Sequence, residues 1–265
     1  MGKGCGCILL RDKVIVVTGA SSGIGALTSR LLSERGAIVI LTARSVDKLE
    51  LVGASLQGRY EIIPLDVSRD DDVARVFKKI FDSYGRIDVL LNNAGYGLFE
   101  YCDEMPVQAF ADMMNVNYMG IVRCTKAVLP SMKEAGTGQI VNIASMAGKL
   151  GTSKSTAYTA TKHAVLGFSN ALRQELKEYG ITVSTVNPGP IDTPFFDLAD
   201  PGGAYVKNVK WFMMKPEKVA SAIVSVIEKR KAEVDLPWFA GIGTKLYQLF
   251  PRLADRLSYK LLNKK

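Results

Sequence analysis

Three side chains are spaced along the sequence in a way that would let them transfer a proton together. Ser145 closes the apolar segment "IVNIAS", Tyr158 follows thirteen residues later, and Lys162 comes four residues after that. Residues four apart share one face of a helix, so we expect the phenol and the ammonium to be neighbours. An unperturbed phenol has a pKa of about 10, and a nearby ammonium or a positively charged nicotinamide favours its phenolate. We therefore predict that Tyr158 exchanges a proton with a substrate oxygen held by Ser145, while a cofactor carries the hydride.

A glycine-rich segment near the start predicts where that cofactor binds. "TGASSGIG", Thr18 to Gly25, follows an apolar run and opens a segment with helical spacing of apolar residues. Glycines let the backbone approach a pyrophosphate, and the helix N-terminus supplies N–H donors and a favourable dipole. A purely structural tight turn is the alternative, but the strand–turn–helix context favours a dinucleotide. The residues predicted to contact it here are Gly19, Ser21, Ser22, Gly23, Ile24 and Gly25.

The end of the second apolar run favours NADP(H) over NAD(H). A carboxylate there would bind the ribose 2′-hydroxyl of NAD, but "LTARS" has none. Arg44 stands there instead, with Thr42 and Ser45 beside it, and a guanidinium can hold a 2′-phosphate by two hydrogen bonds. The alternative is a solvated arginine at a strand end. We predict NADP(H), with Arg44 and Ser45 in contact with it.

Two further strand ends are predicted to border the cofactor. Asp66 and Val67 close the third apolar run, where the adenine would lie. The fourth run ends in "NNAG", whose small residues admit the cofactor along its length. The predicted contacts from these two ends are Asp66, Val67, Asn93, Ala94 and Gly95.

The elements that must position these residues alternate between strand and helix. Buried strands are predicted at residues 13–20, 37–44, 60–67, 87–95, 138–145 and 181–190. Helices are predicted at residues 23–36, 47–58, 71–85, 109–132 and 157–180. Unbroken alternation predicts an α/β fold, a single doubly wound parallel sheet of Rossmann type with helices on both faces.

The chain is predicted to contain one large domain with two extensions. Residues 1–11 are a glycine-rich segment that we expect to be a flexible leader. Residues 12–236 form the dinucleotide-binding and catalytic domain. Within it, residues 190–215 are rich in Pro, Gly and aromatic residues, which is typical of a substrate loop. Residues 237–265 form a basic, amphipathic C-terminal extension.

The C-terminal extension has an apolar stripe set against lysines and arginines. The stripe consists of Leu246, Leu249, Phe250, Leu253, Leu257 and Leu261. This pattern predicts an amphipathic helix, which Pro251 would kink or divide. The helix could pack on its own domain or a second subunit, or make peripheral contact with a membrane surface. The sequence leaves these alternatives open.

Composition narrows the class of protein. The 265 residues are 48% hydrophobic and 23% charged, as in soluble globular proteins, and no apolar run is long enough to span a membrane. The start has no secretory signal, and the four cysteines show no metal-ligand spacing, so we expect a cytoplasmic protein with reduced thiols and no metal. The net charge of +8 suits an anionic cofactor or membrane surface, but no motif indicates a nucleic-acid partner.

Taken together, the motifs resemble those of a known family. "TGASSGIG", "NNAG", the serine, "YTATK" and "NPGPIDT" resemble the short-chain dehydrogenase/reductase family of the classical type over residues 13–231. The resemblance implies that Tyr158 is the acid and base, that Ser145 orients the substrate carbonyl, and that Lys162 lowers the tyrosine pKa and binds the nicotinamide ribose. It implies that Asn117 supports a water-linked proton relay and that the nicotinamide carboxamide contacts Pro188, Gly189, Ile191 and Thr193. It also implies a homodimer or homotetramer.

These observations predict an NADP(H)-dependent oxidoreductase that interconverts a carbonyl and an alcohol. The apolar, aromatic loop predicts a hydrophobic small-molecule substrate. Reduction of 3-oxoacyl groups on a carrier protein is an alternative, against which the long basic tail argues. A protein that senses NADP(H) without turnover is an alternative of a different class, against which the intact set of Ser145, Tyr158 and Lys162 argues.

Overall fold

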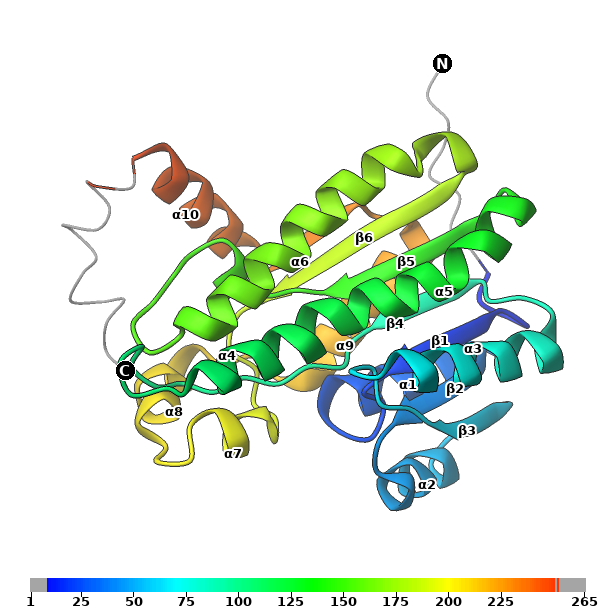
Figure 1. Cartoon of the computed structure of the whole chain (residues 1–265), viewed down its shortest axis with the longest axis horizontal. Coiled ribbons are helices and arrows are strands. Elements are labelled where there is room, and N and C mark those ends of the chain that lie inside the picture. Colours follow the sequence, from blue (N-terminus) through cyan, green and yellow to red (C-terminus); the bar gives the residue numbers. More distant parts are fainter. Residues whose placement is uncertain (1–8, 251, 253–265) are drawn as a thin grey trace.

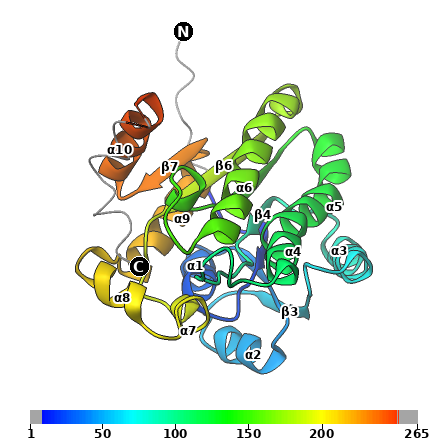
Figure 2. The same cartoon turned by 60° about the vertical axis from the view of Figure 1, so that its left-hand side comes forward.

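Seven parallel strands form one sheet that is covered by helices on both faces (Figure 1, Figure 2). The computed structural model describes residues 9–250 and 252. The strands lie in the order β3-β2-β1-β4-β5-β6-β7, and every neighbouring pair is parallel. They are β1 Val14–Thr18, β2 Ile38–Ala43, β3 Tyr60–Pro64, β4 Val89–Asn92, β5 Gly138–Ile143, β6 Ile181–Pro188 and β7 Glu233–Leu236. The predicted doubly wound α/β fold is confirmed.

Alternating side chains of the strands pack against two separate layers of helices. The larger helices are α1 Gly23–Glu34, α2 Val46–Ala54, α3 Asp70–Tyr84, α4 Val107–Met114, α5 Gly120–Ala135, α6 Thr156–Glu175, α9 Pro216–Lys229 and α10 Trp238–Leu249. In β1, Ile15 and Val17 belong to the core formed with α1 and α9, whereas Val14 and Val16 belong to the core formed with α3 and α5. Because both faces are covered, the strands are continuous apolar runs and not alternating ones.

The order of the strands reverses between β1 and β4. The chain first builds outward from β1 to β3 and then returns to add β4 to β7 on the other side. In doubly wound sheets a crevice opens at the carboxyl ends of the strands at such a switch point. The glycine-rich turn after β1 and the "NNAG" segment after β4 therefore lie next to each other (Figure 1).

The long helix predicted over residues 109–132 is interrupted. The structure has α4, then one π-helical turn at Asn115–Met119, then α5. A π-helical turn adds one residue to the helical repeat and is frequently found at functional sites. Here it surrounds Asn117, whose side chain bonds to the backbone of Tyr96.

Strand β7 is missing from the predicted set of six. It is a four-residue edge strand, "EVDL", that pairs with β6 from Thr185 to Pro188. Two of its four residues are carboxylates, which are uncommon in strands, and its side chains are only partly buried. Both carboxylates accept hydrogen bonds from Asn187 and form ion pairs with Lys149. These interactions explain why an edge strand of this composition is stable.

The two ends of the described chain differ from prediction. Residues 1–8 of the predicted leader lie outside the described residues, but Leu10 is only 3% exposed and packs in the core beside β1. Leu10, which falls within the predicted leader, therefore belongs to the core. Helix α10 begins at Trp238, earlier than the apolar stripe indicates, and Pro251, Leu253, Leu257 and Leu261 lie outside the described residues. None of the described helices has both the length and the apolar character needed to cross a membrane.

Candidate active site

A cleft of about 1820 Å³ opens at the carboxyl ends of the strands and collects the predicted site residues. Its wall includes Ser145, Tyr158 and Lys162. It also includes every predicted cofactor contact: Gly19, Ser21, Ser22, Gly23, Ile24, Gly25, Arg44, Ser45, Asp66, Val67, Asn93, Ala94, Gly95, Pro188, Gly189, Ile191 and Thr193. Residues scattered over most of the chain thus come together in one place. Asn117 is the only predicted site residue that does not line this cleft.

The glycine-rich turn is held tightly against the end of β4. The Asn93 side chain donates hydrogen bonds to the carbonyl oxygens of Thr18 and Gly19, at 2.9 and 3.0 Å. Gly19 has a φ of +65°, and a Cβ there would lie 2.8 Å from Ala94 Cα. A Cβ at Gly25 would overlap the carbonyl oxygen of Gly19. These glycines are therefore required for the turn itself as well as for the approach of a ligand.

The N-terminus of α1 fits a pyrophosphate. Within the described chain, the side chain of its first flanking residue, Ser22, makes no capping hydrogen bond, and its first turn has no carboxylate. The first N–H groups of a helix need acceptors, and the positive end of the helix dipole favours an anion. Ser21, Ser22 and Gly23 all line the cleft at this point. The turn thus presents a backbone cradle that suits the phosphates of a dinucleotide.

Two cations lie at the end of the cleft beside β2. Arg44 follows β2 and is exposed on the cleft wall, next to Ser45, which precedes α2. Lys48, in the first turn of α2, lines the same region. Lys48 was not among the predicted contacts, although a second cation four residues after Arg44 indicates a basic site at this position. The two side chains suit a ligand with an additional phosphate at this end.

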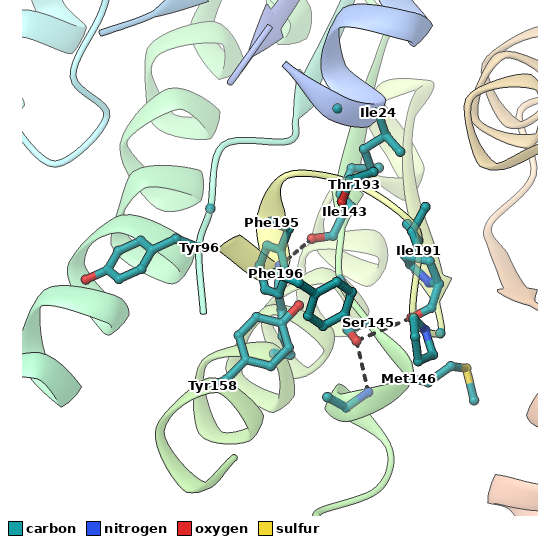
Figure 3. Close-up of a pocket in the computed structure, with 18 of the residues that line it drawn as sticks. Ile24, Tyr96, Ile143, Ser145, Met146, Tyr158, Ile191, Thr193, Phe195 and Phe196 are labelled. Carbon is teal, nitrogen blue, oxygen red and sulfur yellow. Dashed lines mark hydrogen bonds between the residues drawn. The ribbon is translucent and has the colours of Figure 1, made fainter. Parts of the chain in front are cut away.

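Ser145 joins the ends of β5 and β6. Its hydroxyl donates a hydrogen bond to the carbonyl oxygen of Pro188 at 3.3 Å and accepts one from the backbone N–H of Ala147 at 3.1 Å (Figure 3). The second bond begins a short 3₁₀ turn at Met146–Gly148. The serine oxygen is therefore fixed on the cleft wall, and its bond to Pro188 is long and weak.

The hydroxyl of Tyr158 points toward Ser145 (Figure 3). Tyr158 lies in the first turn of α6 and lines the cleft. Burial raises the pKa of its phenol to about 12, and interaction with the Ser145 side chain acts in the opposite direction. From the sequence, the neighbouring ammonium of Lys162 was expected to favour the phenolate. In the structure the loss of solvation is the larger effect, and the protein's own groups keep Tyr158 protonated.

Lys162 lies one helical turn further along α6 and is only 6% exposed. Its ammonium donates a hydrogen bond to the carbonyl oxygen of Ile143 at 2.8 Å and lies 5.6 Å from the centroid of the Tyr158 ring. Burial lowers the pKa of this ammonium to about 8. The predicted adjacency of the phenol and the ammonium is therefore present, with the lysine anchored to the end of β5.

Asn117 stands behind the cleft wall. It is fully buried, its side-chain oxygen accepts from the N–H of Tyr96 at 2.9 Å, and its amide donates to the carbonyl oxygen of Tyr96 at 2.8 Å. The same amide donates to the hydroxyl of Thr161 at 3.2 Å, on α6. Its side chain therefore ties the segment after β4 to the helix that carries Tyr158. These bonds give the side chain a positioning role, and the support of a water-linked proton relay by Asn117 stays a prediction.

Aromatic rings enclose Tyr158 on the substrate side. Its ring centroid lies 6.0 Å from that of Phe99 and 5.6 Å from that of Phe195. Phe195 opens α7, Phe195–Ala199, and Tyr205 lies in α8, Ala204–Val209, so both short helices of the predicted substrate loop contribute. Figure 3 shows Phe195 and Phe196 above the Tyr158 ring. Phe99 was not predicted as a site residue, because no local sequence pattern shows that the segment after "NNAG" turns toward this loop.

The outer end of the cleft is formed by α10 and by the 3₁₀ turn Lys210–Phe212. The residues of these two segments on the cleft wall include Trp211, Phe212, Phe239, Ala240, Gly243, Leu246, Tyr247 and Phe250. The extension predicted to lie outside the catalytic domain therefore supplies part of the site wall. A buried Gly241 lets α10 pack directly on β7, since a Cβ there would overlap the Asp235 carboxylate.

Comparisons with known proteins agree with this geometry. The model of the short chain dehydrogenase family matches residues 13–201. An uncharacterized oxidoreductase of Staphylococcus saprophyticus is 37% identical over 224 residues, which cover 83% of this chain and 93% of the relative. A short-chain dehydrogenase from Streptomyces avermitilis superposes with a TM-score of 0.81 at 31% identity, covering 94% of this chain and 97% of that one. An actinorhodin polyketide ketoreductase solved with NADPH gives a TM-score of 0.77 at 31% identity, covering 84% and 95%.

Proposed function

The chain belongs to the short-chain dehydrogenase family, and on this premise we propose that it is an NADP(H)-dependent oxidoreductase that interconverts a carbonyl and an alcohol. One observation carries the proposal: the Ser145 hydroxyl, the Tyr158 phenol and the Lys162 ammonium meet on the wall of a cleft. At one end of that cleft lies a backbone cradle for phosphates, and at the other lies an apolar chamber.

The preference for NADP(H) rests on the charge at the adenosine end. Arg44 and Lys48 line the cleft there, and the last residues of β2 provide no carboxylate to accept a ribose hydroxyl. A guanidinium and an ammonium together suit a 2′-phosphate. The polyketide ketoreductase that superposes on this chain was solved with NADPH, which agrees with this choice.

Each catalytic side chain has a task that its surroundings support. Bound NADP(H) supplies or accepts the hydride. Tyr158 donates its proton to the carbonyl oxygen during reduction and removes it from the alcohol during oxidation. The hydroxyl of Ser145 turns from its weak bond with Pro188 to donate to the same substrate oxygen. Lys162 keeps a positive charge near the phenolate that reduction leaves behind.

The substrate chamber favours an apolar carbonyl compound. Phe99 and Phe195 pack against Tyr158. Phe196 and Tyr205 pack against those rings, and none of these side chains carries a charge. A pocket of this kind binds by burial of apolar surface, with a few polar groups that fix orientation. Here Ser145 and Tyr158 would be those polar groups.

Replacement of Tyr158 by Phe separates this proposal from a cofactor sensor. We expect Tyr158→Phe to lower kcat by about 10²- to 10⁴-fold in NADPH-linked reduction of apolar aldehydes and ketones, because the proton donor is lost. The Kd for NADPH should change by less than about threefold, since the ring remains. The exposed, remote Tyr179 offers a matched control, Tyr179→Phe, that should retain activity. Equal turnover by Tyr158→Phe and wild type would refute the assigned role, and NADPH binding without turnover on any carbonyl would favour the sensor.

A further inference from the structure

Both tryptophans of the chain are exposed in segments that border the cleft: Trp211 lines it, and Trp238 stands between two lining residues, Pro237 and Phe239. Trp211 is 84% exposed in the 3₁₀ turn Lys210–Phe212, and Trp238 is 73% exposed at the start of α10. Tryptophan is highly buried on average in folded proteins. Two exposed indoles, in segments that border one cleft and in a chain with only two, therefore need a specific explanation.

These indoles belong to a larger apolar surface, here named the rim. Its exposed members are Trp211, Phe212, Trp238, Phe239, Ile242, Leu246, Leu249 and Phe250. Several of them, including Phe212, Phe239 and Leu246, also line the cleft that contains Tyr158. The rim is therefore continuous with the chamber proposed to hold the substrate. Contiguous exposed apolar surface of this kind marks a binding surface for a partner or a membrane.

The two segments that carry the rim have charges of one sign. Beside them, the exposed Asp197 lines the same cleft and the exposed Glu217 follows the first segment directly. Residues 201–216 and 237–250 contain no aspartate or glutamate. They contain four lysines, all exposed: Lys207, Lys210, Lys215 and Lys245. Asp235, beneath α10, is already paired with Lys149. A partner that is apolar and negatively charged therefore matches these two segments.

We propose that the rim docks on a bilayer that contains anionic phospholipid, with the cleft opening toward the lipid. Indole and phenyl rings partition into the interface between headgroups and acyl chains, where an amphipathic helix lies with its apolar face down. The four lysines would face the negatively charged headgroups. An apolar substrate dissolved in the bilayer then enters the chamber without crossing water.

A second copy of the chain fits the rim less well. A two-fold contact between two rims would bring two sets of lysines together, with no carboxylate in either segment to pair with them. An anionic lipid surface satisfies both the apolar and the charged component. This charge argument selects the lipid surface over self-association.

Intrinsic fluorescence tests the proposal without a label. Because Trp211 and Trp238 are the only tryptophans, their emission reports on the rim alone. With the full chain and no substrate, phosphatidylcholine vesicles that contain phosphatidylglycerol should shift this emission to shorter wavelength. High salt should weaken the effect, and phosphatidylcholine alone should give a smaller one. An unchanged emission spectrum, with protein and vesicles sedimenting separately, would overturn the proposal whether or not the proposed reaction holds.

Variants of the rim show where the vesicles bind. We expect Lys210→Glu combined with Lys245→Glu to weaken co-sedimentation with the anionic vesicles by at least about tenfold. Trp211→Ser combined with Trp238→Ser should also weaken it. Lys177→Glu and Leu51→Ser, both exposed and distant from the cleft, are matched controls that should bind like wild type. Undiminished binding by the rim variants, or self-association that buries the tryptophans without vesicles, would contradict the proposal.

Discussion

The ammonium of Lys162 lies 5.6 Å from the centroid of the Tyr158 ring and donates its hydrogen bond to the carbonyl oxygen of Ile143. Burial moves both groups toward their neutral forms, because it raises the pKa of Tyr158 to about 12 and lowers that of Lys162 to about 8. The phenolate therefore needs a further positive charge beside it. Oxidised nicotinamide carries such a charge, so the two directions of the proposed reaction should differ in their pH dependence.

Alcohol oxidation should accelerate with pH, whereas carbonyl reduction should not. Oxidation requires the Tyr158 phenolate, whose fraction rises about tenfold per pH unit below the pKa. Reduction requires the phenol, which predominates when the pKa is about 12, and the Lys162 ammonium, whose pKa is about 8, so the comparison covers pH 6 to pH 8. We expect kcat/KM for an alcohol to climb through this range and kcat/KM for the ketone to stay level. Oxidation that slowed with rising pH would contradict the assignment of Tyr158 as the base.

Replacing Lys162 by Met should reveal the cost of a buried ammonium. The ordinary lysine pKa is 10.5, and in the fold it is about 8. Below pH 8 the ammonium is protonated in the folded and the unfolded chain, and its desolvation destabilises the fold. Between about pH 8 and 10.5 the unfolded chain holds the proton more tightly, so the free energy of unfolding of wild type rises relative to Lys162→Met.

Between about pH 8 and 10.5, the free energy of unfolding of wild type should rise by about 3 kcal/mol relative to that of Lys162→Met, as measured by urea denaturation. The hydrogen bond to Ile143 that the variant loses affects the difference, but less steeply with pH. Lys126→Met, at an exposed site on α5, is the matched control and should show no comparable trend. A difference that stayed constant from pH 7 to pH 10 would show that Lys162 is not held in a desolvated site.

Arg44 should decide the choice between the two nicotinamide cofactors. We expect Arg44→Ala to raise the Kd for NADPH by about 10- to 100-fold, because a charged hydrogen bond to the 2′-phosphate is lost. The Kd for NADH, which has no such phosphate, should change by less than about threefold. Lys48→Ala should have a smaller effect in the same direction. Arg30→Ala, on the exposed face of α1 with a hydrogen bond to Ser55, serves as the control. If Arg44→Ala lost equal affinity for NADPH and NADH, Arg44 would not act by binding the 2′-phosphate.

Lys149 should contribute more to stability than a surface lysine. Its ammonium lies 2.6 Å from both Glu233 Oε1 and Asp235 Oδ1 and is 13% exposed. Burial lowers its pKa, but the hydrogen bonds with Asp235 and Glu233 outweigh this and leave the pKa raised. Lys149→Met leaves two carboxylates side by side, so we expect a loss of about 2–4 kcal/mol in the free energy of unfolding.

A second substitution isolates the cause of that loss. Asp235→Asn, added to Lys149→Met, removes the repulsion and should restore part of the stability. Lys79→Met breaks an ion pair with Glu61 that is about half exposed, and should cost no more than about 1 kcal/mol. Equal losses from Lys149→Met and Lys79→Met in urea denaturation would show that the partly buried cluster is not important for the fold.

Local patterns were sufficient for most of the sheet and for most of the cleft wall. The buried strands are runs of apolar residues that need no knowledge of their neighbours, and the glycine-rich turn follows β1 directly. Parallel strands bring all their carboxyl ends to one edge. Residues at the ends of β2, β3, β4, β5 and β6 could therefore be assigned to one cleft before their positions were known.

Other features depend on contacts between distant segments. β7 has a weak strand pattern because its carboxylates serve Lys149 and Asn187, which are more than forty residues away. The π-helical turn at Asn115–Met119 depends on bonds from Asn117 to Tyr96 and Thr161. In the same way, nothing in the composition of α10 shows that it lines the cleft. These are tertiary effects, which periodicity does not report.

The strand order has a consequence for how such a protein can diversify. Arg44 and Lys48 come from the first fifty residues, on the β2 side of the switch point, whereas the aromatic helices and α10 come from beyond residue 190, on the β6 side. The two groups meet only across the cleft. Evolution can therefore alter the choice of cofactor by a few substitutions near β2 while the substrate chamber stays the same. It can also rebuild the chamber while the redox partner stays fixed.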